Sequence, residues 1–315
     1  MFNYNVHNMK RLIITLLVVV TMAATAMAQQ DPHYSHFMFN QVGYNPAYCG
    51  TEGMINAVLV YRNQWIGMEG SPQTANLCLD APVRFLGSQG GVGATITSDN
   101  IGFEKNFNAK LAYAHHIQAG TGVLSIGIDA GIFNKNIDGD WQFPDQHEAI
   151  FEGKVRKMIF DVGAGIYYNV KGLTLGFSST HLAEPKLDFS EDGETYLARH
   201  YYFVGSYNIN LPNTLFDLTP SAILMSDGKT MQADININIL YNKKVWGGVT
   251  YRNGDAIALL AGLTVMNDIK VGLAYEIGVS KLRKTNSGSF EFMIGYSFMP
   301  ERNKPAQTVR SVRFL

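Results

Sequence analysis

The stretch Asp234–Asn242 reads D-I-N-I-N-I-L-Y-N and alternates between apolar and polar residues. One parity carries Ile235, Ile237, Ile239 and Tyr241, and the other carries Asp234, Asn236, Asn238 and Asn242. Successive side chains of a β-strand point to opposite faces, so this period of two predicts a strand with one apolar and one polar face.

The same period recurs along the chain, for example in Phe160–Val170, Val271–Val279 and Phe290–Phe298. Marking every such run predicts about 14 strands, several of them about 10 residues long, which is the length that a tilted strand needs to cross a bilayer. Their centres lie near Leu59, Leu77, Thr95, Ala112, Ile128, Gly165, Leu175, Val204, Ala222, Ile237, Val249, Leu260, Ala274 and Ile294.

Short clusters of turn-forming residues separate these runs. They are Ser88–Gly91, Asp99–Asn100, Gly120–Gly122, Val170–Gly172, Ser226–Gly228, Asn242–Lys244, Asn253–Asp255, Asn267–Asp268 and Asn286–Gly288. Short turns between neighbouring strands predict an up-and-down antiparallel meander, and an even strand count allows its two edges to close. The predicted fold class is therefore all-β, a transmembrane antiparallel β-barrel with an irregular N-terminal segment.

The composition agrees with a barrel. The chain has 315 residues, a formal net charge of -1, 16% charged residues, 12% aromatic residues and 31 glycines. Near-neutrality disfavours a nucleic-acid binder, and the mean hydropathy of -0.03 excludes a bundle of membrane helices. A soluble β-sandwich is the alternative, because parity alone does not distinguish an inward core from an outward lipid face. The polar parity carries small residues rather than Lys and Glu, which favours the barrel.

The N-terminus has the layout of a secretory signal. Lys10 and Arg11 precede the apolar run Leu12–Val20, and small residues lead to Ala26-Met27-Ala28, a motif for cleavage after Ala28. A transmembrane anchor is the alternative interpretation, and Met9 is an alternative start. The predicted regions are a signal peptide at 1–28, an N-terminal plug or partner segment at 29–53, the barrel at 54–299 and a tail at 300–315. An exported chain of this kind crosses a membrane with strands.

Two acidic stretches between strands, Asn134–Lys154 and Leu182–Tyr196, predict long loops on one side of the barrel. We found no motif of an enzyme, a metal site or a cofactor site. His33 and His36 have metal-ligand spacing but lie in an irregular segment, so we expect them to be exposed to solvent. Cys49 and Cys78 can form a disulfide, although the favoured interpretation is that both act as small apolar residues.

Acidic residues on the polar parity of separate strands, Asp99, Asp129, Asp161 and Asp234, are expected to line the lumen. There they can remain hydrated or pair with Arg62 or Arg252. A network of this kind is a more common arrangement than a catalytic site.

The segment Asp31–Gly50 is rich in aromatic residues but has no strand period. Lipid would leave its backbone groups without partners, so it is predicted to pack inside the barrel as a plug or against a protein partner. A second block, Tyr61–Thr74, reads Y-R-N-Q-W-I-G-M-E-G-S-P-Q-T.

These two blocks resemble the PorP/SprF family of the type IX secretion system. Members typically carry D-P-x-F-S-Q-Y-M-F-N-x-x-x-Y-N-P-A-Y-A-G followed by Y-R-x-Q-W-x-G-x-x-G-A-P-x-T. The resemblance continues through residues 93–102, 161–166, 176–182, 246–252 and 288–296, and so covers almost all of the mature chain. Cys49, Ser71 and Phe290 depart from the pattern.

The resemblance implies an outer-membrane component that supports secretion or surface retention of cargo proteins, including gliding-motility adhesins. It implies no enzymatic activity or cofactor. The partners it implies are other secretion components in the periplasm and outer membrane, the C-terminal domain of the cargo and the lipid bilayer, with no nucleic acid. The predicted partner-binding residues are Tyr34, Phe37, Phe39, Asn40, Tyr44, Asn45, Pro46, Tyr61, Arg62 and Trp65. The alternative is an outer-membrane diffusion channel or hydrophobic-solute transporter.

Overall fold

The computed structural model describes residues 31–85, 87–139, 154–187, 196–212, 214–266 and 268–299. The predicted signal peptide at 1–28 and the tail at 300–315 lie outside these ranges. Within them, every helix is too short or too polar to cross a membrane.

Strands make up most of the described chain. They are β1 (Ile55–Asn63), β2 (Gln73–Phe85), β3 (Ser88–Ile101), β4 (Glu104–Ala119), β5 (Gly122–Asp138), β6 (Lys154–Val170), β7 (Leu173–Thr180), β8 (His200–Tyr207), β9 (Ile209–Asn210), β10 (Phe216–Ser226), β11 (Met231–Tyr241), β12 (Val245–Arg252), β13 (Ala256–Val265), β14 (Ile269–Gly278) and β15 (Ser289–Phe298). The short 3-10 helices are η1 (Gln41–Gly43), η2 (Pro46–Tyr48) and η3 (Lys281–Lys284). All of the predicted strand centres fall inside strands.

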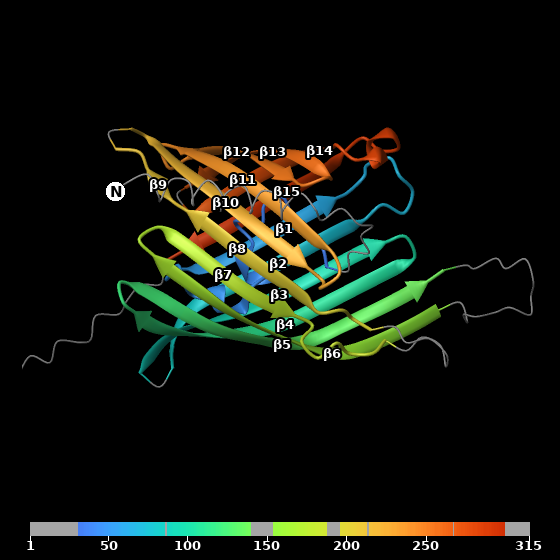
Figure 1. The fold of residues 1–315 in the computed structure, drawn as a ribbon, viewed down its shortest axis with the longest axis horizontal. Helices are drawn as coiled ribbons and strands as arrows, with labels where there is room; N and C mark the ends of the chain where they lie inside the picture. The colour runs from blue at the N-terminus through green and yellow to red at the C-terminus, as the bar shows by residue number, and fades with distance from the viewer. Residues whose placement is uncertain are drawn as a thin grey trace, which may run out of the picture.

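The strands form one closed antiparallel barrel in which neighbours in sequence are neighbours in space (Figure 1). The pairing of β1 with β15 closes the ring. Elements β8 and β9 pair with β10 in one continuous register, since Ser206 lies opposite Ser221 and Ile209 opposite Leu218. They are two parts of one strand, interrupted opposite Pro220, which has no N–H for a ladder bond. The barrel therefore has 14 strands, as the sequence predicted.

Two of the predicted turns are wrong in position. Ser88–Gly91 begins β3, and the preceding turn contains Gly87 at a φ of 81°. Asp99–Asn100 also lies within β3, and the turn that follows contains Gly102 at a φ of 56°. In both cases the flanking ladder continues up to a glycine whose left-handed backbone makes the reversal. Gly91 is instead a residue of the β3 wall.

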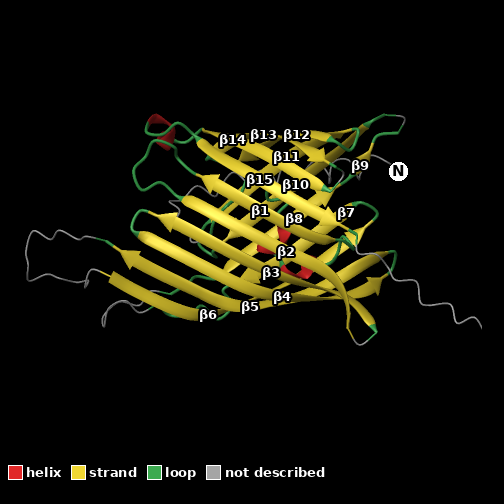
Figure 2. Cartoon of the chain, turned by 180° about the vertical axis from the view of Figure 1, so that it is seen from behind, coloured by secondary structure: helices red, strands yellow, loops and turns green. Residues whose placement is uncertain are grey.

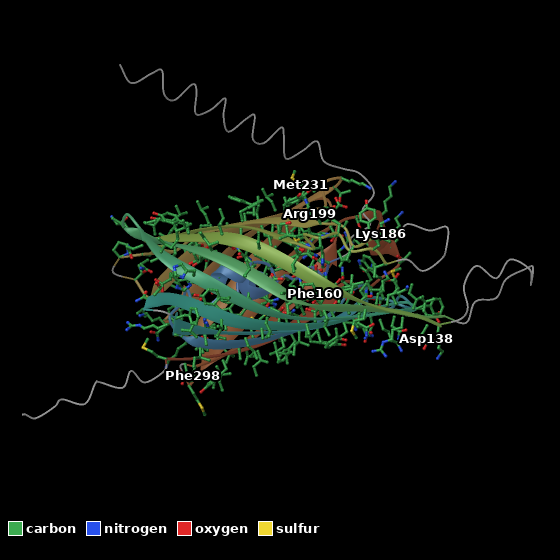
Figure 3. The ribbon with its side chains drawn as sticks, turned by 90° about the horizontal axis from the view of Figure 1, so that it is seen from below. Asp138, Phe160, Lys186, Arg199, Met231 and Phe298 are labelled. Carbon is green, nitrogen blue, oxygen red and sulfur yellow. The ribbon has the colours of Figure 1, made fainter. Side chains whose placement is uncertain are left out.

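Along the strands the apolar side chains are exposed and the polar ones are buried, which is the reverse of the pattern in a soluble protein. In β11, Ile235 is 55% exposed and Asn236 is 0% exposed. Exposed large apolar side chains occur on strands around the ring. Figure 3 shows side chains projecting outward along the part of the wall that faces the viewer. A soluble sandwich would bury its apolar parity, so the sandwich alternative is excluded. The exposed apolar surface is the face that a β-barrel presents to lipid.

Exposed aromatic residues gather near both ends of the strands. Those near one end are Phe85, Tyr207, Phe216, Tyr241, Tyr296 and Phe298, and those near the other are Tyr61, Phe103, Tyr201, Tyr251 and Tyr275. Aromatic rings are favoured at the two interfaces of a bilayer, so these two bands mark the limits of the lipid-facing belt.

The two ends of the barrel differ in their connections. The turn end holds the start of β1, the end of β15 and tight reversals such as Gly120–Thr121 and Lys171–Gly172. The loop end holds the two longest connections, 139–153 and 181–199. Both predicted acidic loops therefore join strands at the same end, although residues 140–153 and 188–195 lie outside the described ranges.

Candidate functional site

Residues 31–53, here called the plug, lie inside the barrel, and the helical turns η1 and η2 are visible behind the strands (Figure 2). The plug keeps its backbone polar groups paired through local turns. Asn45 caps η2, because its Oδ1 accepts a hydrogen bond from the Ala47 backbone at 2.9 Å, and Pro46 occupies the first helical position. This capping explains why N-P-A-Y forms a helical turn rather than a strand.

The plug begins near the loop end and leaves at the turn end. Asp31 contacts the end of β7, where its Oδ2 accepts a bond from Thr180 Oγ1 at 3.2 Å. Farther along, the Gly50 backbone donates to Asp80 Oδ2 at 2.8 Å, close to the turn end of β2. The segment therefore runs through the lumen before it enters β1.

Glycines in the wall make room for backbone and side-chain atoms of the plug. A Cβ at Gly91 would lie 2.0 Å from the Cys49 carbonyl oxygen, one at Gly127 2.3 Å from the Ala47 nitrogen, and one at Gly165 2.1 Å from Asn45 Oδ1. No side chain fits at these distances, so the wall and the plug match in shape. The sequence signal for this was present as glycines inside strands, which mark close approach of another backbone.

The opposite part of the lumen is apolar where it meets the plug aromatics. Tyr34, Phe37 and Tyr44 share one buried cluster with inward side chains of the wall, namely Val60, Tyr202, Val204, Ile223, Met225, Trp246, Leu260 and Met293. Full burial of one large apolar side chain stabilises a fold by about 1.5–3 kcal/mol. The inward-facing side chains of the strands are therefore small and polar over only part of the wall. Over the rest they are apolar, and the plug covers them.

A buried ionic network joins the plug to the loop-end half of the wall. Arg62 from β1 is 1% exposed and contacts Glu276 at 2.7 Å and Glu291 at 3.2 Å. Glu291 also accepts hydrogen bonds from the backbones of Ser35 and His36, both at 2.8 Å, and contacts His36 Nδ1 at 2.6 Å. Each buried charge thus has a partner, which is the condition for burying charges at all.

A second pair of charges extends this network. Arg252 contacts Asp234 at 3.1 Å and Glu276 at 3.0 Å, and His33 Nε2 lies 3.0 Å from Asp234 Oδ2. The expected pairing of Asp234 with an arginine is therefore confirmed. Asp161 pairs with Lys110 at 2.7 Å instead.

The prediction that His33 and His36 are exposed is wrong, since they are 4% and 0% exposed. Their carboxylate partners come from β11 and β15, near the other end of the chain. Spacing within the N-terminal segment holds no information about these partners.

The predicted partner-binding residues occupy different places. Seven are buried inside the barrel: Tyr34, Phe37, Asn40, Tyr44, Asn45, Pro46 and Arg62. Trp65 is half-buried on the loop between β1 and β2, where its backbone donates to Ser289 Oγ at 3.2 Å. Tyr61 is exposed on the outer wall. The seven buried residues agree with the interpretation of this segment as a plug. A role for them in partner binding stays a prediction.

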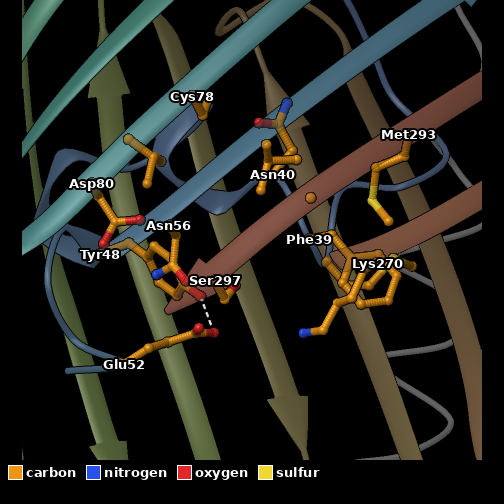
Figure 4. A pocket seen from close by; sticks show the side chains of 14 residues that line it. Phe39, Asn40, Tyr48, Glu52, Asn56, Cys78, Asp80, Lys270, Met293 and Ser297 are labelled. Carbon is orange, nitrogen blue, oxygen red and sulfur yellow. Dashed lines mark hydrogen bonds between the residues drawn. The ribbon is translucent and has the colours of Figure 1, made fainter. Parts of the chain in front are cut away.

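Phe39 is half-buried beside a cavity of about 50 Å³ (Figure 4). Its ring packs 4.9 Å from the Trp246 ring, and Lys270 Nζ lies 5.8 Å from the Phe39 ring centre. Glu52, near the end of the plug, and Ser297, near the end of β15, also line the cavity, which therefore lies at the turn end of the barrel. Phe39 and Tyr48 are the plug aromatics that line this turn-end cavity.

Cys49 and Cys78 are free thiols in one small buried cluster with Val42 and Ala114. The favoured interpretation of both as small apolar residues is confirmed. Burial raises the pKa of the Cys49 thiol, and the nearby Asp80 carboxylate adds to this rise. The protonated thiol is a poor nucleophile and both thiols are buried, so we expect both to react slowly while the plug is in place.

The chain matches the family model of the type IX secretion system membrane protein PorP/SprF over residues 26–296. Among solved structures it is similar to the Acinetobacter baumannii outer membrane protein Omp33, with a TM-score of 0.48 and 5% identity over 78% of this chain and 99% of that chain. It is also similar to a Rhodopseudomonas blastica porin triple mutant, with a TM-score of 0.35 and 10% identity over 78% of this chain and 99% of that chain. No curated protein matches.

The family match spans both the plug and the barrel that encloses it. The two blocks that suggested the family lie at the plug and at the end of β1 with the loop that follows it. The chain belongs to the PorP/SprF family of type IX secretion system membrane proteins.

Proposed function

We propose that this protein is an outer-membrane platform of the type IX secretion system, which supports secretion or surface retention of cargo proteins, including adhesins of the gliding-motility type. The observation that carries the proposal is the family match over residues 26–296, which includes the plug and all strands but the last residues of β15. A cleavable signal peptide at residues 1–28 would deliver the chain to the periplasm.

The packing of the plug favours a platform over a diffusion channel or solute transporter. Plug residues contact the wall through an ionic network, an apolar cluster and several fitted glycines. Two cavities beside the plug measure about 50 and 60 Å³. Passage of a solute would require the plug to leave these contacts.

The two ends of the barrel suggest where partners bind. In outer-membrane barrels the short turns face the periplasm and the longer loops face outward. By this rule Phe39 and Lys270 lie toward periplasmic components of the system, whereas Trp65 lies toward the cell surface. Other outer-membrane components and the cargo C-terminal domain would then meet the loop end.

Gene deletion tests the proposal. We expect the deletion strain to lose surface display of specific type IX cargo while its outer-membrane permeability to small antibiotics stays unchanged. Complementation with the wild-type gene should restore display, and Trp65→Ala should restore it only in part. Val249→Ala, which shortens an exposed side chain of β12 on the lipid-facing wall, is the control. Normal cargo display in the deletion strain would contradict the proposal, and altered permeability with normal display would favour a channel.

A further inference from the structure

Asp31, at the start of the plug, faces two histidines of the wall. His181 directly follows β7 and His200 is the first residue of β8, so both lie at the loop end. One carboxylate oxygen and one ring nitrogen from each histidine all lie within 4.8 Å of one another. Both imidazoles are buried, whereas Asp31 is partly exposed.

Each histidine has an acceptor at its Nδ1. His181 Nδ1 lies 2.8 Å from Asp161 Oδ2, and His200 Nδ1 lies 3.0 Å from the Ala198 carbonyl oxygen. An N–H on Nδ1 donating to these acceptors leaves the lone pair of each ring on Nε2. Metal-binding histidines in proteins are oriented in the same way, by a carboxylate or a carbonyl behind the ring.

The carboxylate of Asp31 is fixed on its far side. Its Oδ2 accepts hydrogen bonds from Tyr202 OH at 2.6 Å and from Thr180 Oγ1 at 3.2 Å. Its Oδ1 lies 3.0 Å from His181 Nε2. Lys110 pairs with Asp161 at 2.7 Å, so Asp161 is already neutralised and Asp31 is the carboxylate available to an ion.

The dimensions suit a zinc ion. Bonds from Zn²⁺ to imidazole nitrogen and carboxylate oxygen are about 2.0–2.2 Å long, so two ligand atoms on one ion are at most about 4.4 Å apart. The three atoms lie within 4.8 Å of one another, so a small rotation of the side chains would bring them to that separation. A cavity of about 60 Å³, lined by Asp31, Thr180, His181 and Tyr202, provides room for a fourth ligand such as water.

We propose that Asp31, His181 and His200 form a zinc site that ties the start of the plug to the barrel wall. The site takes one ligand from the plug and two from the wall, so a bound ion cross-links segments that are about 150 residues apart in the chain. This proposal is independent of the role in secretion. It predicts metal-dependent stability of the plug whatever cargo the system carries.

A protonated His181 held between Asp31 and Asp161 without any ion is the competing arrangement. It uses the same 3.0 and 2.8 Å contacts but gives His200 no role as a ligand. Because the two arrangements differ in their need for His200, a variant of this residue separates them.

The experiment uses the full-length protein in detergent, without a polyhistidine tag and stripped with a chelator. Titration with ZnCl2 by calorimetry should show one ion per chain with micromolar or tighter affinity. Titration with Co²⁺ should give the visible absorption bands of a four-coordinate site. His200→Ala and Asp31→Asn should each weaken zinc binding by more than about tenfold. His115→Ala, which removes a histidine of β4 beside Tyr113, should leave the affinity unchanged.

Thermal unfolding provides a second readout. Zinc should raise the unfolding temperature of the wild-type protein, since an ion that binds only the folded state stabilises it, and should not raise that of His200→Ala. Heat-dependent gel migration checks that each variant has formed its barrel. Absence of saturable zinc binding by the wild-type protein overturns the proposal, as does wild-type affinity in a folded His200→Ala protein.

Discussion

Arg62 keeps a positive charge in a nearly solvent-free position because two glutamates from different strands surround it. Glu276 lies on β14 and Glu291 on β15, and the plug adds Ser35 and His36 to the same carboxylates. At the residue scale, each buried charge in the lumen is therefore stabilised by its neighbours, and together they hold the plug against the wall. Removal of Arg62 would leave Glu276 with Arg252 alone and Glu291 with His36 alone as ionic partners. Two buried carboxylates that have lost part of their compensation cost more than the pair contributes when intact.

We expect Arg62→Ala to lower the free energy of unfolding by about 3 kcal/mol, because Glu276 and Glu291 would keep their charges without their shared partner. Equilibrium unfolding in urea, with the protein folded in lipid vesicles, measures this change. Arg84→Ala is the control, since Arg84 is exposed on β2, and we expect it to change stability by less than about 0.5 kcal/mol. Equal stabilities of the two variants would show that the network does not hold the plug.

At the scale of the strand, each β-strand faces lipid on its outer side and the lumen on its inner side. Outward positions of β11 carry isoleucines that face lipid, whereas inward positions carry Asp234 and asparagines that face the lumen. The glycines of β3, β5 and β6 show a second demand on the inward face, since they admit the plug backbone. The composition of a strand therefore reports both the membrane outside it and the segment inside it.

The cost of a charge on the outer face should depend on its depth in the bilayer. We expect Ile237→Lys, at the middle of β11, to lower the free energy of unfolding by about 3 kcal/mol, and Val265→Lys, at the end of β13, to lower it by less than about 1 kcal/mol. The measurement is unfolding from lipid vesicles. The same penalty at both sites, or none at Ile237, would argue against the lipid-facing belt assigned to this wall.

At the scale of the whole molecule, plug and barrel are one unit whose contacts join distant parts of the chain. The Ser35 backbone meets Glu291 across 256 positions of sequence, and Asn45 Nδ2 donates to the Ile166 carbonyl across 121. These contacts hold the plug inside the barrel, where both thiols are buried. The state of the plug can therefore be followed through conductance and through thiol reactivity.

Displacing the plug should open the lumen. We expect the wild-type protein to conduct little in planar bilayers and its two thiols to react slowly with a maleimide. Gly91→Ala places a methyl group 2.0 Å from the Cys49 carbonyl oxygen, so it should raise both conductance and labelling rate.

Gly247→Ala is the matched control for this experiment, because the nearest atom to its Cβ is the Leu260 carbonyl oxygen at 3.5 Å. Denatured protein gives the full count of two reactive thiols. Strong conductance of the wild-type protein with both thiols protected would mean that the plug does not seal the barrel.

Much of the architecture could be predicted from local pattern alone. The period of two located the strand centres, and the irregular aromatic segment at Asp31–Gly50 marked the plug. The resemblance of this segment and of Tyr61–Thr74 to the PorP/SprF family was confirmed. Alternation is a property of neighbouring residues, so a single sequence contains it.

The contents of the lumen could not be predicted in this way. The glycines at Ser88–Gly91 were interpreted as a turn, and His33 and His36 as exposed, because their partners lie far away in the chain. Which parity faces outward also required the closed ring, since a sandwich and a barrel share the same alternation.

By itself, the sequence determined the strands, their order and the presence of a segment that is not a strand, because backbone geometry ties side-chain direction to position in the chain. Only the tertiary structure decided what fills the barrel. Closure of the barrel brings β15 beside β1. It also places Glu291, Asp234 and His181 around residues 31–36, although all three are far from that segment in the sequence.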